Sequence, residues 1–206
     1  MLRKIISGFL AGVLVSIGGT VYLSCENKSV GAVLFSVALL CICKKGYSLY
    51  TGKIGFIPER HGREDVSVLL FGLLGNILAT LLCGFALRYA LPAVYENAPL
   101  ICAAKLSQSA GSTLIRAAFC GILMYLAVCI YRDRENIVGI LFCIPVFILS
   151  GYEHSVANLF YFAAGGFSWS AVLYIAIVFV GNTCGSMLFA ILESVGKDKT
   201  ENGKES

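Results

Sequence analysis

Six stretches of mostly apolar residues follow one another along the chain, with short polar segments between them. They cover residues 5–23, 30–57, 66–91, 114–131, 137–162 and 169–192. About 20 consecutive apolar residues are needed for a helix to cross the hydrocarbon core of a bilayer. The pattern therefore predicts an all-α integral membrane protein with six transmembrane helices.

Polar residues interrupt the second and the fifth of these stretches. The second is apolar over 30–43, is broken by KKGYSLYTGK and resumes at IGFIP; the fifth is apolar over 137–152, is broken by EHSVAN and resumes at LFYFAAGGF. Non-helical backbone at membrane depth is tolerated only inside protein or beside a polar cavity. We therefore expect two broken helices that face each other across a polar passage.

The two halves of the chain repeat this arrangement. Each interrupted stretch is the middle one of three, and the third carries a Gly-Asn pair, in FGLLGNILATLL and in IVFVGNTCGSML. Thr51 precedes Asn76 by 25 residues, and His154 precedes Asn182 by 28. A unit of three spans begins and ends on opposite faces, so two copies, about 5–91 and 114–192, would form an inverted repeat. Paired interrupted helices in such repeats indicate a transport site near the bilayer midplane.

Composition and charge agree with this interpretation. The chain is 58% hydrophobic and 14% charged, whereas soluble domains are roughly 45–50% apolar and about 25% charged. We predict one transmembrane domain over 1–196 and a disordered cytoplasmic tail over 197–206. The net charge of +4 is dispersed over short loops, which does not suggest nucleic acid. If the N-terminus is cytoplasmic, the lysines and arginines other than Lys44 and Lys45 number ten on the inner side and four on the outer side, which favours both termini inside.

The sequence offers little for a cofactor, a metal or catalysis. Nine cysteines form no CxxC pair, and most lie within apolar stretches, where cysteine packs as a small apolar residue. There are two histidines, and His61 lies in a polar loop beside Arg60 and Arg63. We expect no enzyme, because no nucleophile and base or metal ligands come together. A non-conducting scaffold stays as a further alternative, although broken helices would serve no purpose in it.

His154 is the candidate functional group of the passage. Ionisable residues at membrane depth mark functional sites, and a histidine changes charge near neutral pH. A bare anion has a large desolvation penalty in apolar surroundings, so an imidazolium that gives its proton to an anion would let it cross as a neutral acid. A structural histidine held by Glu153 or a carbonyl is the alternative. We expect Glu153 to satisfy backbone N–H groups of the break. Lys44 and Lys45 either complement the C-terminal dipole of the first half-helix or attract anions.

Several segments resemble one known family. GYEHSVANLF is similar to the signature of the fifth helix of the formate/nitrite transporter family, and GYSLYTG is similar to its GAELFTG motif in the second helix. LLGNILATLL, VGNTCGSML and GILMYLAVC resemble the motifs of helices three, six and four. The resemblance extends over roughly residues 5–192.

The resemblance implies an aquaporin-like protomer, a homopentamer in the cell membrane and a pore in each protomer. Family members conduct formate, nitrite, hydrosulfide, acetate or lactate, with a proton as second partner, and we expect formate first. His154 matches the central histidine, Thr51 the pore-facing threonine and Asn182 the asparagine near the pore. The apolar constrictions match Phe35 and Phe147 on one side, and Leu39, Leu49 and Val128 on the other.

The chain also departs from the family pattern. Tyr125 stands where the family has asparagine, Ser48 replaces an acidic residue, and Lys44 and Lys45 replace apolar or small residues. Tyr125 and Lys45 therefore join the candidate pore residues. We expect structural roles at the helix breaks for Glu153, Ser155, Asn158, Gly46, Gly52 and Asn76.

Overall fold

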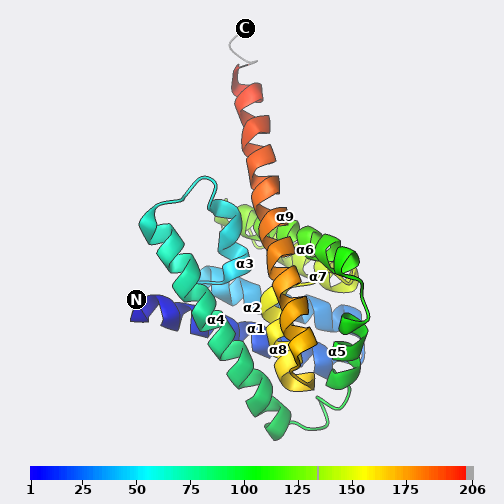
Figure 1. Cartoon of the computed structure of the whole chain (residues 1–206). Helices are drawn as coiled ribbons and strands as arrows, with labels where there is room; N and C mark the ends of the chain where they lie inside the picture. Colours follow the sequence, from blue (N-terminus) through cyan, green and yellow to red (C-terminus); the bar gives the residue numbers. More distant parts are fainter. Residues whose placement is uncertain (134, 203–206) are drawn as a thin grey trace.

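The computed structural model describes residues 1–133 and 135–202, and its regular elements in that part of the chain are all helices (Figure 1). They are α1 (Leu2–Ser24), α2 (Lys28–Lys45), α3 (Tyr50–Lys53), the 3₁₀ helix η1 (Ile54–Phe56), α4 (Arg63–Ala90), α5 (Ala98–Leu106), α6 (Ala110–Arg132), α7 (Val138–Leu149), α8 (Ser155–Gly165) and α9 (Trp169–Asn202).

Four of these helices, α1, α4, α6 and α9, are long and apolar enough to cross a membrane by themselves. Helix α2 forms a fifth candidate together with α3 and η1, and the pair bends by 58° at the break. Helix α7 is apolar but has only 12 residues before the second break. The all-helical, multi-pass fold is confirmed, while a sixth span made of α7 and α8 stays a prediction.

Both broken helices end in the same way. Gly46 and Gly151 each have a φ of 68°, in the left-handed region where a side chain is strained. In each case the glycine N–H and the next N–H bond back to carbonyls of the preceding helix, from Tyr47 to Ile42 and from Tyr152 to Phe147. This pattern is a common way to terminate a helix and satisfy its last carbonyls. A glycine thus sets the position of each break.

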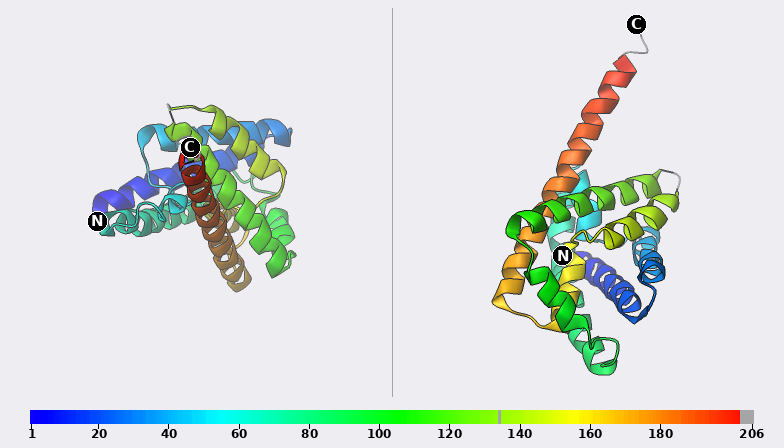
Figure 2. Two further views of the ribbon diagram at one scale, coloured as in Figure 1. Left: turned by 90° about the horizontal axis from the view of Figure 1, so that it is seen from above. Right: turned by 90° about the vertical axis from the view of Figure 1, so that its right-hand side faces the viewer.

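Small residues allow the long helices to pack closely in each half. A side chain at Gly75 of α4 would collide with the Ile5 carbonyl of α1, and one at Gly185 of α9 would collide with the Ala118 carbonyl of α6. Close backbone approach is how helices associate in lipid, where burial of apolar surface gives little drive. The helices of the pairs α1–α4 and α6–α9 lie side by side (Figure 2), and Leu49 and His154, which follow the two breaks, are buried.

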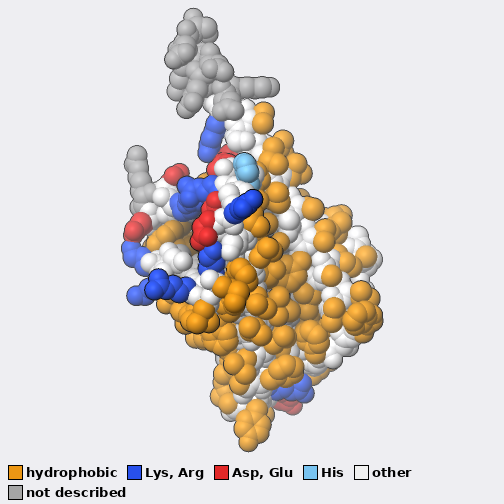
Figure 3. All heavy atoms as spheres, turned by 60° about the vertical axis from the view of Figure 1, so that its left-hand side comes forward, with side chains coloured by type: hydrophobic (Ala, Val, Ile, Leu, Met, Phe, Trp, Pro, Cys, Tyr) orange, Lys and Arg blue, Asp and Glu red, His pale blue; other side chains and the backbone are white. Residues whose placement is uncertain are grey.

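Two helical segments were not predicted from the sequence: α5 and the C-terminal end of α9. The segment between α4 and α6 contains the short helix α5, and α9 remains helical to Asn202 (Figure 1). The expected disordered tail over 197–206 therefore begins as helix, and residues 203–206 lie outside the described part. On the face drawn in Figure 3, hydrophobic side chains cover most of the surface and charged ones gather mainly toward one end.

Candidate pore site

Two buried asparagines hold the two breaks with matching hydrogen bonds. Asn182 of α9 accepts the Ser155 N–H (2.9 Å) and donates to the carbonyls of Glu153 and Ala117 (2.8 Å each). Asn76 of α4 accepts the Tyr50 N–H (2.9 Å) and donates to the carbonyls of Ser48 (2.9 Å) and Gly8 (2.7 Å). Each carboxamide therefore bridges one break to the first long helix of its own half.

This correspondence changes the alignment of the two repeats, in which the sequence had placed Thr51 opposite His154. The asparagines bracket His154 between Glu153 and Ser155 in one half, and Leu49 between Ser48 and Tyr50 in the other. Leu49 and His154 are also the N-cap residues of α3 and α8. The segments GYSL and GYEH are thus equivalent, and Leu49 is the structural counterpart of His154. The repeated Gly-Tyr pair was the signal for this register.

His154 and Thr51 nevertheless meet across the interface between the two breaks. His154 Nε2 lies 2.8 Å from Thr51 Oγ1, and both residues are buried. The other ring nitrogen, Nδ1, accepts the Ala157 N–H at 3.1 Å and so caps α8. A nitrogen that accepts a backbone N–H carries no hydrogen itself, which leaves Nε2 as the protonated nitrogen of a neutral ring. An imidazolium at this position would require that the cap to Ala157 be released.

Cavities lead toward His154 from two sides. On the α5 side lies a cavity of about 200 Å³, the α5-side vestibule, whose lining includes Lys105, Glu153 and His154. A chamber of about 10 Å³ follows beside His154. Beyond it lie a cavity of about 150 Å³, the α3-side vestibule, and a wider mouth of about 370 Å³, which share Gly52 and Lys53.

The predicted constriction residues lie where these cavities adjoin. Phe35 and Phe147 line both the α5-side vestibule and the chamber. Leu39 and Leu49 line both the chamber and the α3-side vestibule. Val128, which was expected beside those leucines, lies one cavity further, between the α3-side vestibule and the mouth.

The chamber itself is closed in this conformation. Its walls include Met124 and Ile144, which sequence reasoning did not single out. The Phe147 ring stacks on His154 with centroids 5.7 Å apart and meets Phe35 edge-on at 6.4 Å. A volume of about 10 Å³ is near the minimum for one water. An anion can enter only when these side chains move.

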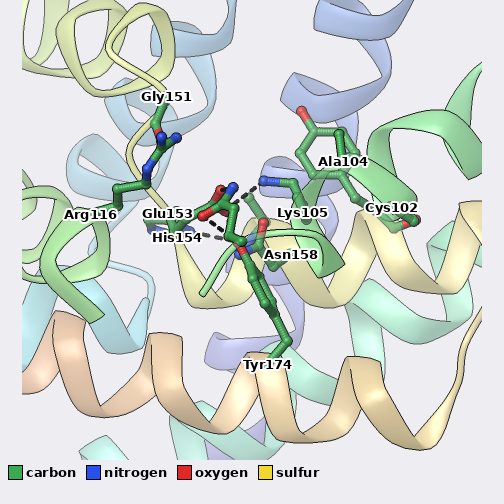
Figure 4. A network of polar contacts seen from close by, with 12 residues as sticks. Cys102, Ala104, Lys105, Arg116, Gly151, Glu153, His154, Asn158 and Tyr174 are labelled. Atoms are coloured by element: carbon green, nitrogen blue, oxygen red, sulfur yellow. Dashed lines mark hydrogen bonds and ion pairs between the residues drawn. The ribbon is translucent and has the colours of Figure 1, made fainter. Parts of the chain in front are cut away.

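Glu153 is held by side chains and not by the backbone N–H groups that the sequence predicted. Its carboxylate accepts from Lys105 at 2.6 Å and from Asn158 at 2.9 Å (Figure 4). It also accepts from Gln108 at 3.0 Å. Arg116 contacts the same break through the Gly151 carbonyl. Lys105 comes from α5, and its cation neutralises the carboxylate next to His154. The predicted Asn158 therefore acts at the break, but Lys105 and Gln108 were missed because they lie in and just after α5, far away in the sequence.

Of the predicted pore residues, Thr51 and Asn182 are buried and do not line these cavities, and two others lie away from the row altogether. The Tyr125 hydroxyl donates to Glu193 at 2.8 Å, and the residue lines a separate side cavity of about 280 Å³ together with Phe56 and Cys129. Lys45 is exposed at the end of α2 and belongs to the lining of neither the mouth nor the α3-side vestibule. Lys44 forms an ion pair with Glu135.

The remaining predicted residues lie at the breaks themselves. Ser155 donates its N–H to Asn182, while its buried hydroxyl has no hydrogen-bond partner among the described residues. Gly52 faces α6, where a side chain would press on Val128 at 3.3 Å. Within the described ranges, no three His, Cys, Asp or Glu side chains are placed so that they could hold a metal ion.

The formate/nitrite transporter family model matches residues 1–196. The chain is 27% identical to a probable formate transporter of Methanothermobacter thermautotrophicus, over 91% of this chain and 85% of that one. It is 26% identical to the uncharacterized transporter YrhG of Bacillus subtilis (90% and 81%) and to the nitrite transporter NirC of Salmonella typhimurium (89% and 79%).

Solved structures agree on the fold. An ion channel described as belonging to the FNT family superposes with a TM-score of 0.78 at 24% identity and covers 95% of this chain and 90% of that one. A pentameric formate channel with formate bound gives a TM-score of 0.72 at 20% identity, over 94% and 95% of the two chains. On the extent of the family match, the chain belongs to the formate/nitrite transporter family.

Proposed function

We propose that the protein is a membrane channel for small monovalent anions or their protonated acids, with formate as the first candidate. Relatives that carry the names of formate and nitrite transporters support this class of substrate. Nitrite or hydrosulfide is the alternative within the same fold. The observation that carries the proposal is the row of cavities that reaches His154, which is hydrogen-bonded to Thr51, between two apolar constrictions.

Two hydrogen-bond donors lie at the narrow point, the Nε2–H of His154 and the hydroxyl of Thr51. The imidazole N–H donates to Thr51 Oγ1, and that hydroxyl hydrogen has no other hydrogen-bond partner among the described residues. An anion that enters the chamber can accept the Nε2–H when the bond between His154 and Thr51 opens, and the Thr51 hydroxyl can then turn toward it. The apolar walls penalise its charge, which favours its neutral acid at this point.

The proton would pass from His154 to the anion. With Nδ1 bonded to the Ala157 N–H, the ring is neutral. When this cap is released, the ring accepts a proton from water in the α5-side vestibule, which His154 lines, and the resulting imidazolium then gives a proton to the anion. The products are a neutral ring and a neutral acid, so charge and protons balance. We therefore expect proton exchange to be coupled to loosening of the first turn of α8.

The assembly and orientation complete the proposal. We propose a homopentamer, as in the pentameric formate channel of similar fold, embedded in the lipid bilayer of the cell membrane. Both termini are cytoplasmic, on the basis of the excess of lysine and arginine in the corresponding loops. The α3-side vestibule then opens to the cytoplasm and the α5-side vestibule to the outside.

Flux measurements on purified protein test this function. Proteoliposomes that contain a pH-sensitive dye are mixed with formate, nitrite, acetate or hydrosulfide over pH 5–8. The proposal expects rapid flux for formate or nitrite, above that of protein-free liposomes. A protein that is folded and pentameric but passes none of these anions would instead support the non-conducting scaffold.

A further inference from the structure

We propose that Lys53 and Arg132 form an anion-binding site in the α3-side vestibule, where a small monovalent anion is held before it reaches the constriction at Leu39 and Leu49. The inference rests on the proposed anion-channel function and deepens it. It assigns the capture of the anion to two residues at the cytoplasmic end of the row of cavities.

Lys53 lies one helical turn from the constriction. Leu49 caps the N-terminus of α3, and Lys53 is the last residue of that four-residue helix. At 1.5 Å per residue, the two Cα positions are about 6 Å apart along the helix axis. Lys53 is half-buried and lines both the α3-side vestibule and the mouth. An ammonium group is therefore available on the approach to the narrow point.

Arg132 brings a second cation to the same space from the end of α6. It lines the α3-side vestibule and the mouth, like Lys53. Its guanidinium carbon lies 4.4 Å from the centroid of the Phe56 ring, a cation–π contact that restricts the side chain. Arg132 also reaches the side cavity, where Glu59 and Asp133 are part of the lining. Lys53 is absent from that lining and belongs to the pore-side cavities.

The charge in the α3-side vestibule is not balanced by protein carboxylates. Its lining contains Lys53 and Arg132 together with the phenols Tyr47 and Tyr131, and no Asp or Glu. Among the described residues, neither cation takes part in an ion pair. The lining of the wider mouth also includes Arg60 and Asp65, whose opposite charges add no net charge. Two like charges in one cavity with low-dielectric walls repel each other, and an anion between them relieves that repulsion.

The opposite vestibule lacks this imbalance. Its cation, Lys105, is in a 2.6 Å ion pair with Glu153, and both belong to the lining. The two ends of the pore therefore differ in net charge although their backbones repeat. At the α3 side an anion meets two uncompensated cations, whereas at the α5 side it meets a neutral pair. We infer that affinity for the anion is higher from the cytoplasmic face.

Cys43 provides a probe inside this cavity, because it lines the α3-side vestibule beside Lys53. In a background in which Cys43 is the one remaining cysteine, inverted membrane vesicles are treated with anionic sulfonatoethyl or cationic trimethylammonioethyl methanethiosulfonate. We expect the anionic reagent to modify Cys43 faster. Lys53→Gln or Arg132→Gln should lower the ratio of anionic to cationic rates about tenfold, because one charge acts on both reagents with opposite sign.

Formate flux gives a second readout with the native cysteines in place. Lys53→Gln should raise the KM for formate from the cytoplasmic side about threefold to tenfold, should leave the KM from the outer side within twofold, and should weaken its dependence on ionic strength. Arg63→Gln is the matched charge control, since Arg63 is exposed at the start of α4 and lines neither cavity.

The outcomes separate this site from the function on which it rests. A rate ratio that stays the same in Lys53→Gln and Arg132→Gln, or a Cys43 that neither reagent reaches, would overturn the site. Lys45→Gln with an effect as large as that of Lys53→Gln would also overturn it in favour of the exposed lysine. A lowered ratio in a protein that carries no formate would leave the anion site standing and refute the choice of substrate.

Discussion

The ion pair between Glu153 and Lys105 allows a quantitative test of how the second break is held. Lys105→Met would leave the carboxylate, whose side chain is 3% exposed, without its cation, although Gln108 and Asn158 would still donate to it. Removal of one partner from a buried pair costs about 3–5 kcal/mol, because the other charge stays buried without compensation. For a chain of this length each kcal/mol shifts the Tm by about 2–4 °C. We therefore expect the Tm to fall by about 6–20 °C.

Thermal unfolding of the detergent-purified protein, followed by loss of the oligomer peak in size-exclusion chromatography, measures this shift. Lys4→Met is the matched control: its ion pair with Glu64 has a similar length of 2.7 Å, but Glu64 is 78% exposed. An exposed pair is worth about 0–1 kcal/mol. The double variant Lys105→Met/Glu153→Gln should regain most of the lost stability, because the introduced amide carries no charge and can still accept a hydrogen bond.

Two results would refute this reasoning. In one, Lys105→Met lowers the Tm no more than Lys4→Met does, which would mean that the carboxylate is well solvated without its lysine. In the other, Lys105→Met/Glu153→Gln is as unstable as Lys105→Met, which would mean that the loss comes from packing of the lysine stem and not from the unpaired charge.

Three further variants test other parts of the site. Asn182→Leu removes three buried hydrogen bonds around His154 and should lower the free energy of unfolding by about 3 kcal/mol or more. Chemical unfolding should show this loss and formate flux should fall, and a stable, fully active variant would contradict the asparagine bridge. Tyr125→Phe loses the hydrogen bond to Glu193, which should lower the stability by about 1 kcal/mol, and should keep its formate flux because Tyr125 lines the side cavity. A changed anion preference would show that Tyr125 lines the pore. Leu49→Ala shortens a constriction side chain and should raise acetate flux relative to formate in stopped-flow swelling; an unchanged ratio would place the narrow point elsewhere.

The helical architecture and the breaks could be predicted because their signals are local. Apolar length marks a span, and a polar interruption such as EHSVAN in an apolar helix marks a position where the backbone leaves the helix. Gly46 and Gly151, followed in each half by tyrosine, also fix where each half-helix ends. A register between the halves based on these glycines aligns Leu49 with His154, and the spacings to Asn76 and Asn182 are then 27 and 28 residues, closer than the 25 and 28 obtained with Thr51.

The charged surroundings could not be predicted in the same way. Lys105 lies 48 residues before Glu153 in the chain, and nothing in the connecting segment 92–113 indicates that α5 folds back over the second break. Lys53 and Lys45 are close in sequence, but the turn at Gly46 separates them, and only Lys53 lines the α3-side vestibule. For Tyr125, a family motif gave the position, while the larger side chain extends toward Glu193 on α9.

The most direct test of the central claim is the pH dependence of formate flux in wild type and in His154→Phe. Both proteins are reconstituted as folded pentamers, and flux is measured over pH 5–8 on each. Proton exchange at His154, beside Thr51 and between two apolar constrictions, predicts that the phenylalanine variant loses most of the flux and its pH dependence. Equal flux with an unchanged pH profile would show that the anion crosses without this histidine and would contradict the account.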